Sequence, residues 1–152
     1  MLETPHVAFG AVIAKAIPNP LISVPLALAS HFLLDVTPHW NPHLNTEIKK
    51  YGKLTNNTLL VIGLDLASSV LLTGFFLKSS LPDSTLFLNI LLCSVASVLP
   101  DAVEGPYFIF GWKNKIVDKW IKFQKSIQVD ANLFWGLLTQ VLVVLGALYV
   151  FS

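Results

Sequence analysis

The sequence has no arginine, a single cysteine and few charged side chains. Charged residues make up 12% of the 152 positions, about half of the roughly 25% usual in soluble domains. Hydrophobic residues make up 54%, and the mean hydropathy is +0.67. A net charge of +1 argues against a disordered chain and against a nucleic-acid partner. Cys93 alone cannot form a disulfide framework. All ten basic residues are lysine, which excludes a bidentate guanidinium clamp. We therefore expect a small integral membrane protein.

Five apolar segments predict an all-α membrane bundle of about four to five helices, with residues 1–152 forming one membrane domain. The segments are residues 7–17, 21–36, 59–77, 86–99 and 133–151. The third and fifth have the roughly 20 residues that cross a bilayer, and the fourth reaches that length if it begins near Ser84 and continues past Pro100. The first two are separated by Pro18, Asn19 and Pro20, which break a helix. They predict a helical hairpin whose first arm is too short to cross the membrane and is covered by its neighbours.

The lysines predict how the chain is oriented in the membrane. Eight of the ten lie between the second and third segments or between the fourth and fifth segments, which puts them on one side of an up-and-down bundle. The positive-inside rule makes that side cytoplasmic. We therefore expect an inner-membrane protein of a bacterium with a cytoplasmic N-terminus. The four tryptophans fall in or beside the same two loops, as expected for residues at a membrane interface.

Residues 111–127 predict an amphipathic helix in the membrane interface. Apolar side chains recur there at spacings of three and four residues, with five lysines largely between them. Such a helix lies on the leaflet surface, where its lysines can contact anionic lipid headgroups. The alternative is a soluble helix that covers the ends of the membrane helices. The apolar positions are Trp112, Ile116, Trp120, Phe123 and Ile127.

Histidines and acidic residues within or beside the apolar segments are the main functional signal. A charged side chain at a helix centre costs about 2.5–3.5 kcal/mol on insertion scales, so several such residues need partners. His31 and Asp35 are four residues apart and share a helix face. Asp101 and Glu104 are three apart and share another. The predicted topology brings six such residues to the cytoplasmic end, where they can meet in one layer. They are His6, His31, Asp35, Asp65, Asp101 and Glu104.

These residue types together predict a divalent metal site. Carboxylates gathered in a low-dielectric medium repel one another, and a divalent cation relieves that repulsion. Histidine nitrogen with carboxylate oxygen suits zinc, with manganese or iron(II) as alternatives. The predicted metal ligands are His6, His31, Asp35, His39 and Asp101, and the predicted catalytic bases are Asp65 and Glu104.

Simpler roles for the same residues stay open at this point. His31 could bond a carbonyl of a neighbouring helix. Asp65 could join two helices as a protonated carboxyl, and Asp101 could cap a helix after Pro100. Glu104 and His39 could be interfacial residues.

The element His31-x-x-x-Asp35, followed by His39, resembles the H-x-x-x-D…H element of zinc-dependent phospholipase C and related nucleases. Together with His6 and Asp101, the layout of about the first 110 residues resembles small bacterial membrane-bound metal-dependent hydrolases. That resemblance implies metal ligands at His6, His31, Asp35 and Asp101. The chain differs from those hydrolases because it lacks their H-R-x-x-T-H-S-like element.

The leading functional prediction is a membrane-embedded metal-dependent hydrolase. Its substrate would be a phosphoester or a lipid-linked molecule reached from the cytoplasmic leaflet. A small transporter linked to cations or protons is an alternative, although the chain shows none of the repeats common in transporters. A non-catalytic membrane scaffold is the other alternative. A scaffold predicts carboxylates paired with amides or hydroxyls and no shared cavity.

Overall fold

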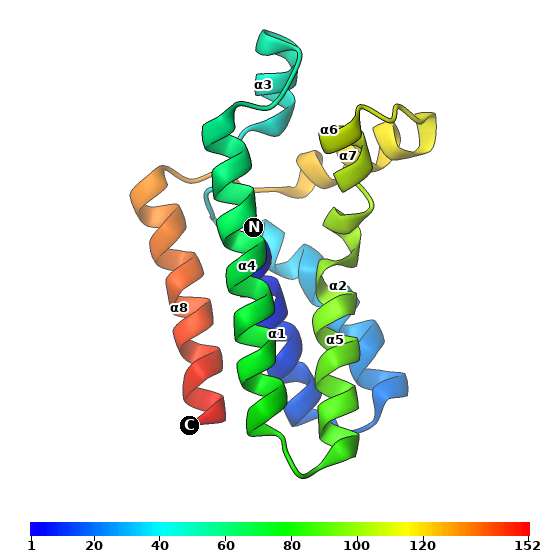
Figure 1. Cartoon of the computed structure of the whole chain (residues 1–152), viewed down its shortest axis with the longest axis vertical. Coiled ribbons are helices and arrows are strands. Elements are labelled where there is room, and N and C mark those ends of the chain that lie inside the picture. Colours follow the sequence, from blue (N-terminus) through cyan, green and yellow to red (C-terminus); the bar gives the residue numbers. More distant parts are fainter.

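The computed structural model describes residues 1–152 as eight α-helices without a sheet (Figure 1). The helices are α1 (Glu3–Ala16), α2 (Pro20–Val36), α3 (Leu44–Tyr51), α4 (Asn56–Ser79), α5 (Ser84–Ala102), α6 (Gly105–Phe110), α7 (Lys115–Ile127) and α8 (Leu133–Phe151). The predicted all-α class is confirmed. The five apolar segments correspond to α1, α2, α4, α5 and α8. The short helices α3 and α6 were not predicted.

Three helices, α4, α5 and α8, are long and apolar enough to cross a membrane, and α2 is a shorter apolar helix. Large apolar side chains on these helices point outward. Leu71 of α4 is 75% exposed and Tyr149 of α8 is 81% exposed. An exposed surface this apolar is typical of helices that face lipid.

The hairpin of α1 and α2 forms where the sequence predicts it. Asn19 caps α2 by accepting a hydrogen bond from Leu21 N at 3.0 Å, and Pro20 takes the first helical position, where its missing N–H is not needed. The 14 residues of α1 rise about 21 Å, less than the roughly 30 Å of a bilayer core. The first arm is therefore short, as predicted.

A side chain of α5 secures the end of this short arm. Asn89 Nδ2 donates to the carbonyl oxygens of Ala14 and Ile17, both at 2.9 Å. Ser23 Oγ of α2 donates to Asn89 Oδ1 at 2.6 Å. Carbonyls at a helix end have no partner within the helix and cannot be left bare away from water. One amide of α5 thus supplies hydrogen bonds to two of the carbonyl groups at the end of α1.

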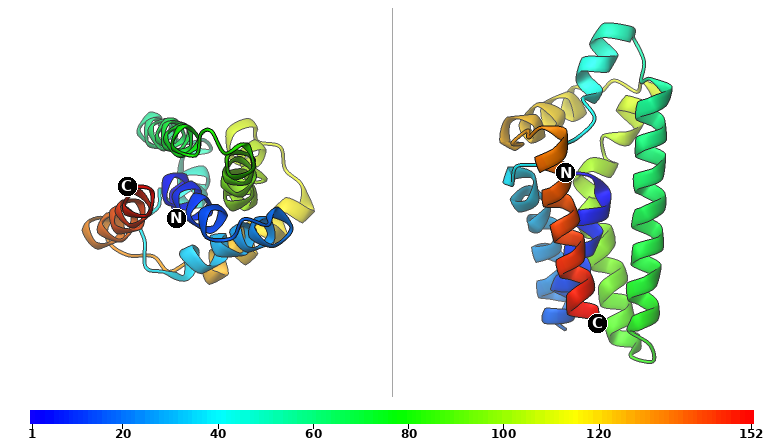
Figure 2. Two further views of the ribbon diagram at one scale, coloured as in Figure 1. Left: turned by 90° about the horizontal axis from the view of Figure 1, so that it is seen from below. Right: turned by 90° about the vertical axis from the view of Figure 1, so that its left-hand side faces the viewer.

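Close packing places α1 at the centre of the bundle, between α2, α4, α5 and α8 (Figure 2). Its inner residues are small, including the buried Ala8, Ala11 and Ala14. A Cβ atom at Gly10 would lie 2.8 Å from the Cys93 carbonyl oxygen of α5. Small residues let helix backbones approach closely, which is how apolar helices associate in lipid.

The two lysine-rich segments meet at one end of the molecule. In Figure 1, α3, α6 and α7 lie together at the end opposite the C-terminus. Of the two remaining lysines, Lys15 reaches the far end, where its Nζ donates to Val150 O of α8 at 2.6 Å. The charge asymmetry expected from the loops is therefore present in the fold.

The amphipathic helix begins later than predicted. Gly111 adopts φ +67°, a left-handed conformation that ends α6. Asn114 then caps α7 by accepting from Ile116 N at 2.8 Å. Residues 111–114 form a connection rather than a helical turn, so Trp112 lies outside the helix. The shift arises because Gly111 ends one helix and Asn114 begins the next. The spacing of the apolar residues does not reveal either of these signals.

Helix α7 carries three different faces. Ile121 and Gln124 are buried against the rest of the protein, whereas Ile116 and Phe123 are 77% and 48% exposed. Lysines occupy the remaining face and are exposed. Trp120 anchors the helix, because its Nε1 donates to Pro100 O of α5 at 3.0 Å. One face therefore packs on the bundle while an apolar face stays uncovered beside the lysines.

Candidate metal centre

Four helices bring buried polar side chains together near the lysine-rich end. His6 comes from the start of α1, His31 and Asp35 from the last turns of α2, and Asp101 from the end of α5. The side chains of His6, His31 and Asp35 are completely buried, and that of Asp101 is 21% exposed. Helix α7 lies across them and supplies Gln124. The layer is thus built from segments far apart in the sequence.

His6, His31 and Asp101 form a group that could hold a metal ion. Each offers one nitrogen or carboxylate oxygen, and these atoms all lie within 4.8 Å of one another. His31 Nε2 is 3.5 Å from Asp101 Oδ1, and the two imidazoles stack with ring centroids 4.1 Å apart. Atoms bound to one zinc ion at about 2.0–2.2 Å lie roughly 3–4 Å from each other. Small side-chain movements would therefore bring the three groups onto one ion.

Asp35 lies beside both imidazoles of this group. Its Oδ1 is 3.5 Å from His6 Nε2, and its Oδ2 is 3.4 Å from His31 Nε2. The α-amino group of Met1 contacts the same carboxylate. Asp35 is therefore the anionic neighbour of the histidines and can bind or orient them.

His6 is the residue of this group whose surroundings most clearly lack a partner. Neither of its ring nitrogens has a hydrogen-bond partner, although the side chain is fully buried. A buried polar group without a partner costs about 1–3 kcal/mol, and buried polar groups are normally paired. An ion at the group described above would supply a partner for one of these nitrogens. The residues present therefore fit a metal ion.

His31 is already oriented for such a role. Its Nδ1 lies 2.8 Å from Ser97 O of α5, an acceptor that fixes the proton on that nitrogen. Its Nε2 lies 3.1 Å from Gln124 Oε1 and faces the group. Metal-binding histidines commonly donate their other ring nitrogen to a carbonyl in this way. The structure thus shows the simpler role considered for His31, a hydrogen bond to a carbonyl of a neighbouring helix. That bond uses Nδ1 and leaves Nε2 available for coordination.

Gln124 is a component that sequence reasoning missed. Its Nε2 donates to Asp101 Oδ1 at 2.8 Å and to Glu104 Oε1 at 2.7 Å. Its Oε1 lies 3.1 Å from His31 Nε2, so one amide contacts three members of the layer. The available signal was its place four residues after Trp120, a polar side chain on the inner face of an amphipathic helix.

Glu104 lies just beyond α5, at the edge of the layer. Burial, and to a lesser extent the nearby carboxylate of Asp101, raises the pKa of Glu104 to about 7, while the hydrogen bond from Gln124 acts in the opposite direction. A carboxyl with such a pKa can exchange a proton near neutral pH. Its position next to Asp101 is consistent with the predicted role as a base.

Asp65 is nearby but already has a full set of partners. It accepts from Glu3 N at 2.6 Å, from Thr4 N at 3.1 Å and from Thr4 Oγ1 at 2.6 Å. These are the free N–H groups at the start of α1, which attract an anion. Asp65 of α4 therefore caps α1 from a neighbouring helix. These contacts match the role of joining two helices, which the sequence left open, better than they match the predicted role of catalytic base.

His39 lies on the other side of Asp35. Its Nε2 is 3.9 Å from Asp35 Oδ1, and its Nδ1 lies 2.8 Å from Thr37 O. Burial lowers the pKa of His39 and keeps its ring neutral. The structure places His39 next to a member of the layer rather than within the group of His6, His31 and Asp101.

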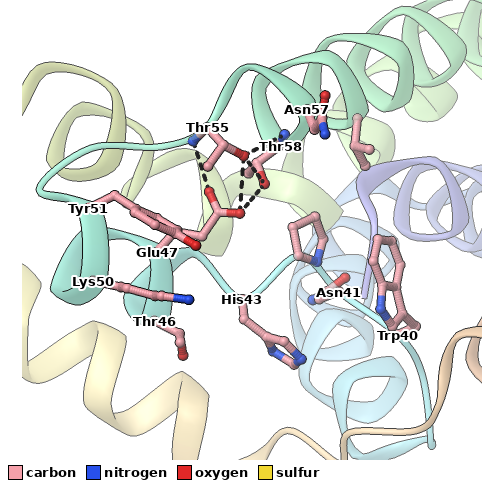
Figure 3. A pocket seen from close by; sticks show the side chains of 12 residues that line it. Trp40, Asn41, His43, Thr46, Glu47, Lys50, Tyr51, Thr55, Asn57 and Thr58 are labelled. Atoms are coloured by element: carbon pink, nitrogen blue, oxygen red, sulfur yellow. Dashed lines mark hydrogen bonds between the residues drawn. The ribbon is translucent and has the colours of Figure 1, made fainter.

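A separate pocket of about 460 Å³ lies outside this layer, between α3 and the start of α4. Figure 3 shows Glu47 directed toward Thr55 and Thr58 at the beginning of α4. Glu47 accepts from Thr55 N at 2.9 Å and from Thr58 Oγ1 at 2.7 Å. Its carboxylate is thus used to cap α4, and the pocket contains no unpaired acid.

No protein-family model, curated protein or solved structure matches the chain. The resemblance to membrane-bound metal-dependent hydrolases therefore stays a prediction carried by His6, His31, Asp35 and Asp101.

Proposed function

We propose that the protein is a membrane-embedded, metal-dependent hydrolase that cleaves phosphoester bonds in lipid or lipid-linked substrates. The observation that carries this proposal is the buried His6 imidazole, which has no hydrogen-bond partner and lies beside His31 and Asp101. A purely structural layer would satisfy that side chain, as it satisfies Asp65.

The proposed ligands are His6, His31 and Asp101, with Asp35 binding or orienting the imidazoles. Three protein ligands are typical of catalytic zinc sites, which keep one position open. A bound zinc ion would lower the pKa of a coordinated water toward about 7 and polarise a phosphoryl oxygen. Manganese and iron(II) suit the same donor atoms.

The remaining residues of the layer would position and move protons. Glu104 is the proposed acceptor of the proton released at the site, because its raised pKa matches neutral conditions. Gln124 holds Glu104 and Asp101 through one amide nitrogen. That shared contact fixes the acid at a constant distance from the proposed ligand.

The proposed orientation puts the layer near the cytoplasmic leaflet. Helices α3 and α7 carry most of the lysines and lie at the end opposite the C-terminus (Figure 1), and α7 contributes Gln124 to the layer. We place α7 in the interface, with Ile116 and Phe123 toward the acyl chains and its lysines toward anionic headgroups. The five apolar helices α1, α2, α4, α5 and α8 would form the bundle within the bilayer.

The one-sided placement of the buried histidines and acidic residues supports hydrolysis over transport. A proton or cation path needs ionisable groups through the thickness of the membrane. The buried residues below the layer are apolar, such as Phe76 and Ile90, or uncharged, such as Asn89 and Ser23.

The proposal is tested by measuring metal in the protein purified in detergent. We expect close to one zinc, manganese or iron ion per chain, and loss of that ion in His31→Ala and Asp101→Asn. The matched controls are His43→Ala and Asp118→Asn, which change the same residue types outside the layer. Phosphate release from a lipid phosphoester should stop on chelation and return when metal is added. Folded protein that binds no metal would overturn the proposal, as would equal metal contents in the ligand and control variants.

A further inference from the structure

A large groove runs between α4 and α5 and ends at the polar layer. Its volume is about 740 Å³, within the roughly 300–1,000 Å³ of small-molecule sites. Most of its depth is lined by apolar or small side chains. On α4 and α5 these include Leu66, Val70, Gly74, Leu91, Ser94 and Val95.

The groove is long enough to hold an acyl chain across one leaflet of a bilayer. On α4 its lining extends from Ile62 to Leu77, and a step of fifteen residues along a helix rises about 22 Å. Half of a bilayer core measures about 15 Å. Both walls come from helices that are long and apolar enough to cross a membrane. The groove therefore offers an apolar channel along the direction in which lipid chains lie.

The two ends of the groove differ in chemistry. At one end the lining includes four carboxyl groups, those of Glu3, Asp65, Asp101 and Glu104, together with the basic side chains of His43 and Lys125. Lys125 also pairs with Asp130, with Nζ 2.8 Å from Oδ2. At the other end the wall is Leu77 and Leu91. A molecule with a polar head and an apolar tail matches this gradient, and the proposed metal ion would attract the phosphate of an anionic head.

The groove is kept open by small residues. Ser69, Thr73 and Gly74 of α4 and Ser94 of α5 all line it. A Cβ at Gly74 would meet no atom within 4 Å. Ser94 Oγ is buried and has no hydrogen-bond partner. Larger apolar residues at these positions would fill the space and pack α4 against α5.

We propose that this groove seats one acyl chain of a phospholipid, which places its phosphate at Asp101 and Glu104. The substrate would then be a membrane phospholipid that enters sideways from the leaflet rather than a soluble phosphoester. Calling the bound lipid a substrate rests on the proposed function, whereas the lipid-binding site itself rests on the groove alone.

The test compares Gly74→Phe with Ala67→Phe in vesicles of phosphatidylglycerol that contain a photoreactive diazirine on one acyl chain. Phe at position 74 enters the groove, whereas Ala67 of α4 is exposed and does not line it. We expect labelling of α4 and α5 groove residues to fall about tenfold or more in Gly74→Phe, as overpacking excludes the chain. Labelling should be unchanged in Ala67→Phe.

Further measurements separate the lipid site from the hydrolase. Labelling should persist in metal-free protein and in His31→Ala, because the acyl chain does not need the ion. For the loaded enzyme, Gly74→Phe should lower kcat/KM for the phospholipid and spare p-nitrophenyl phosphate. Groove labelling that is lost in Gly74→Phe, without hydrolysis of either compound, would support the lipid site and overturn the hydrolase proposal alone. Equal labelling in both variants, labelling spread evenly onto α8, or a covalent dimer formed through the groove would overturn the inference.

Discussion

Two neighbouring regions of the polar layer differ in whether their buried polar side chains have hydrogen-bond partners. At the α1 cap, defined here as Asp65 with Glu3 N and Thr4, every carboxylate oxygen has at least one donor. At the imidazole group of His6, His31 and Asp101, one histidine has no hydrogen bond at all. Both regions lie in the same apolar surroundings and involve the same helix, α1.

The contrast separates a structural carboxylate from a candidate ligand. Asp65 neutralises the free N–H groups of a helix that begins inside the protein, which is a task complete without any further atom. The imidazole group has donor and acceptor capacity left over. Residual capacity in a buried place indicates a missing partner, because native structures rarely leave such groups unpaired.

The strongest test of the contrast is Asp65→Ala. Loss of the cap leaves two N–H groups of α1 without an acceptor, whereas the Thr4 hydroxyl keeps the main-chain oxygen of residue 65 at 3.1 Å, and we expect the free energy of unfolding to fall by about 3 kcal/mol. Metal content per folded chain should not change. Thermal denaturation in detergent and metal analysis measure the two effects, and Asp65→Asn should recover part of the stability. A metal-free but equally stable variant would make Asp65 a ligand and remove the distinction.

The reverse effect is expected for His6→Phe. In metal-free protein this change removes an unpaired buried imidazole and keeps a flat ring against His31, so stability should rise by roughly 1–2 kcal/mol. In metal-loaded preparations the wild-type chain should be the more stable one, because binding favours the folded state. Melting temperatures with and without chelator measure both comparisons. Destabilisation of the metal-free variant would show that His6 is satisfied in a way the contacts do not reveal.

A smaller change probes a single contact of the α1 cap. Thr4→Val keeps the shape of the side chain but removes the hydroxyl that donates to Asp65 Oδ1 at 2.6 Å. We expect a loss of about 1 kcal/mol, measured by thermal denaturation, with unchanged metal content. Thr4→Ser keeps the hydroxyl and serves as the control. An effect of Thr4→Val as large as that of Asp65→Ala would mean that the hydroxyl alone carries the cap.

The smallest effect is expected at Glu47, a partly exposed counterpart of the Asp65 cap. Hydrogen bonds from Thr55 N and Thr58 Oγ1 hold the pKa of Glu47 below its ordinary value of 4.5. Its contribution to stability is therefore present above that ordinary value and is lost as the pH falls through the lowered pKa of the folded state. In metal-free protein, Glu47→Gln should flatten this acid loss slightly relative to wild type. Identical pH profiles would show that the contact has no net effect on stability.

Much of the fold could be predicted from the sequence, because apolar run length and lysine position act through the membrane rather than through specific contacts. The hairpin could be predicted from Pro18 and Pro20. The proximity of His6, His31 and Asp101 could be predicted from the order and direction of the helices. The role of Asp65 did not follow, since it depends on which helix begins beside it. Gln124 was missed because it reaches the layer from a surface helix whose packing direction is not encoded in lysine spacing.

Backbone pairing ties the surface helix to the buried layer. After α7 the chain runs beside the exit of α2, where Val129 N donates to Asp35 O at 3.2 Å, His39 N donates to Val129 O at 3.1 Å, and Ala131 N donates to His39 O at 2.8 Å. Lifting α7 off the bundle would therefore pull at these main-chain links and withdraw Gln124 at the same time. The polar layer and α7 are therefore coupled. The contacts around Asp101 are complete only while α7 is packed on the bundle.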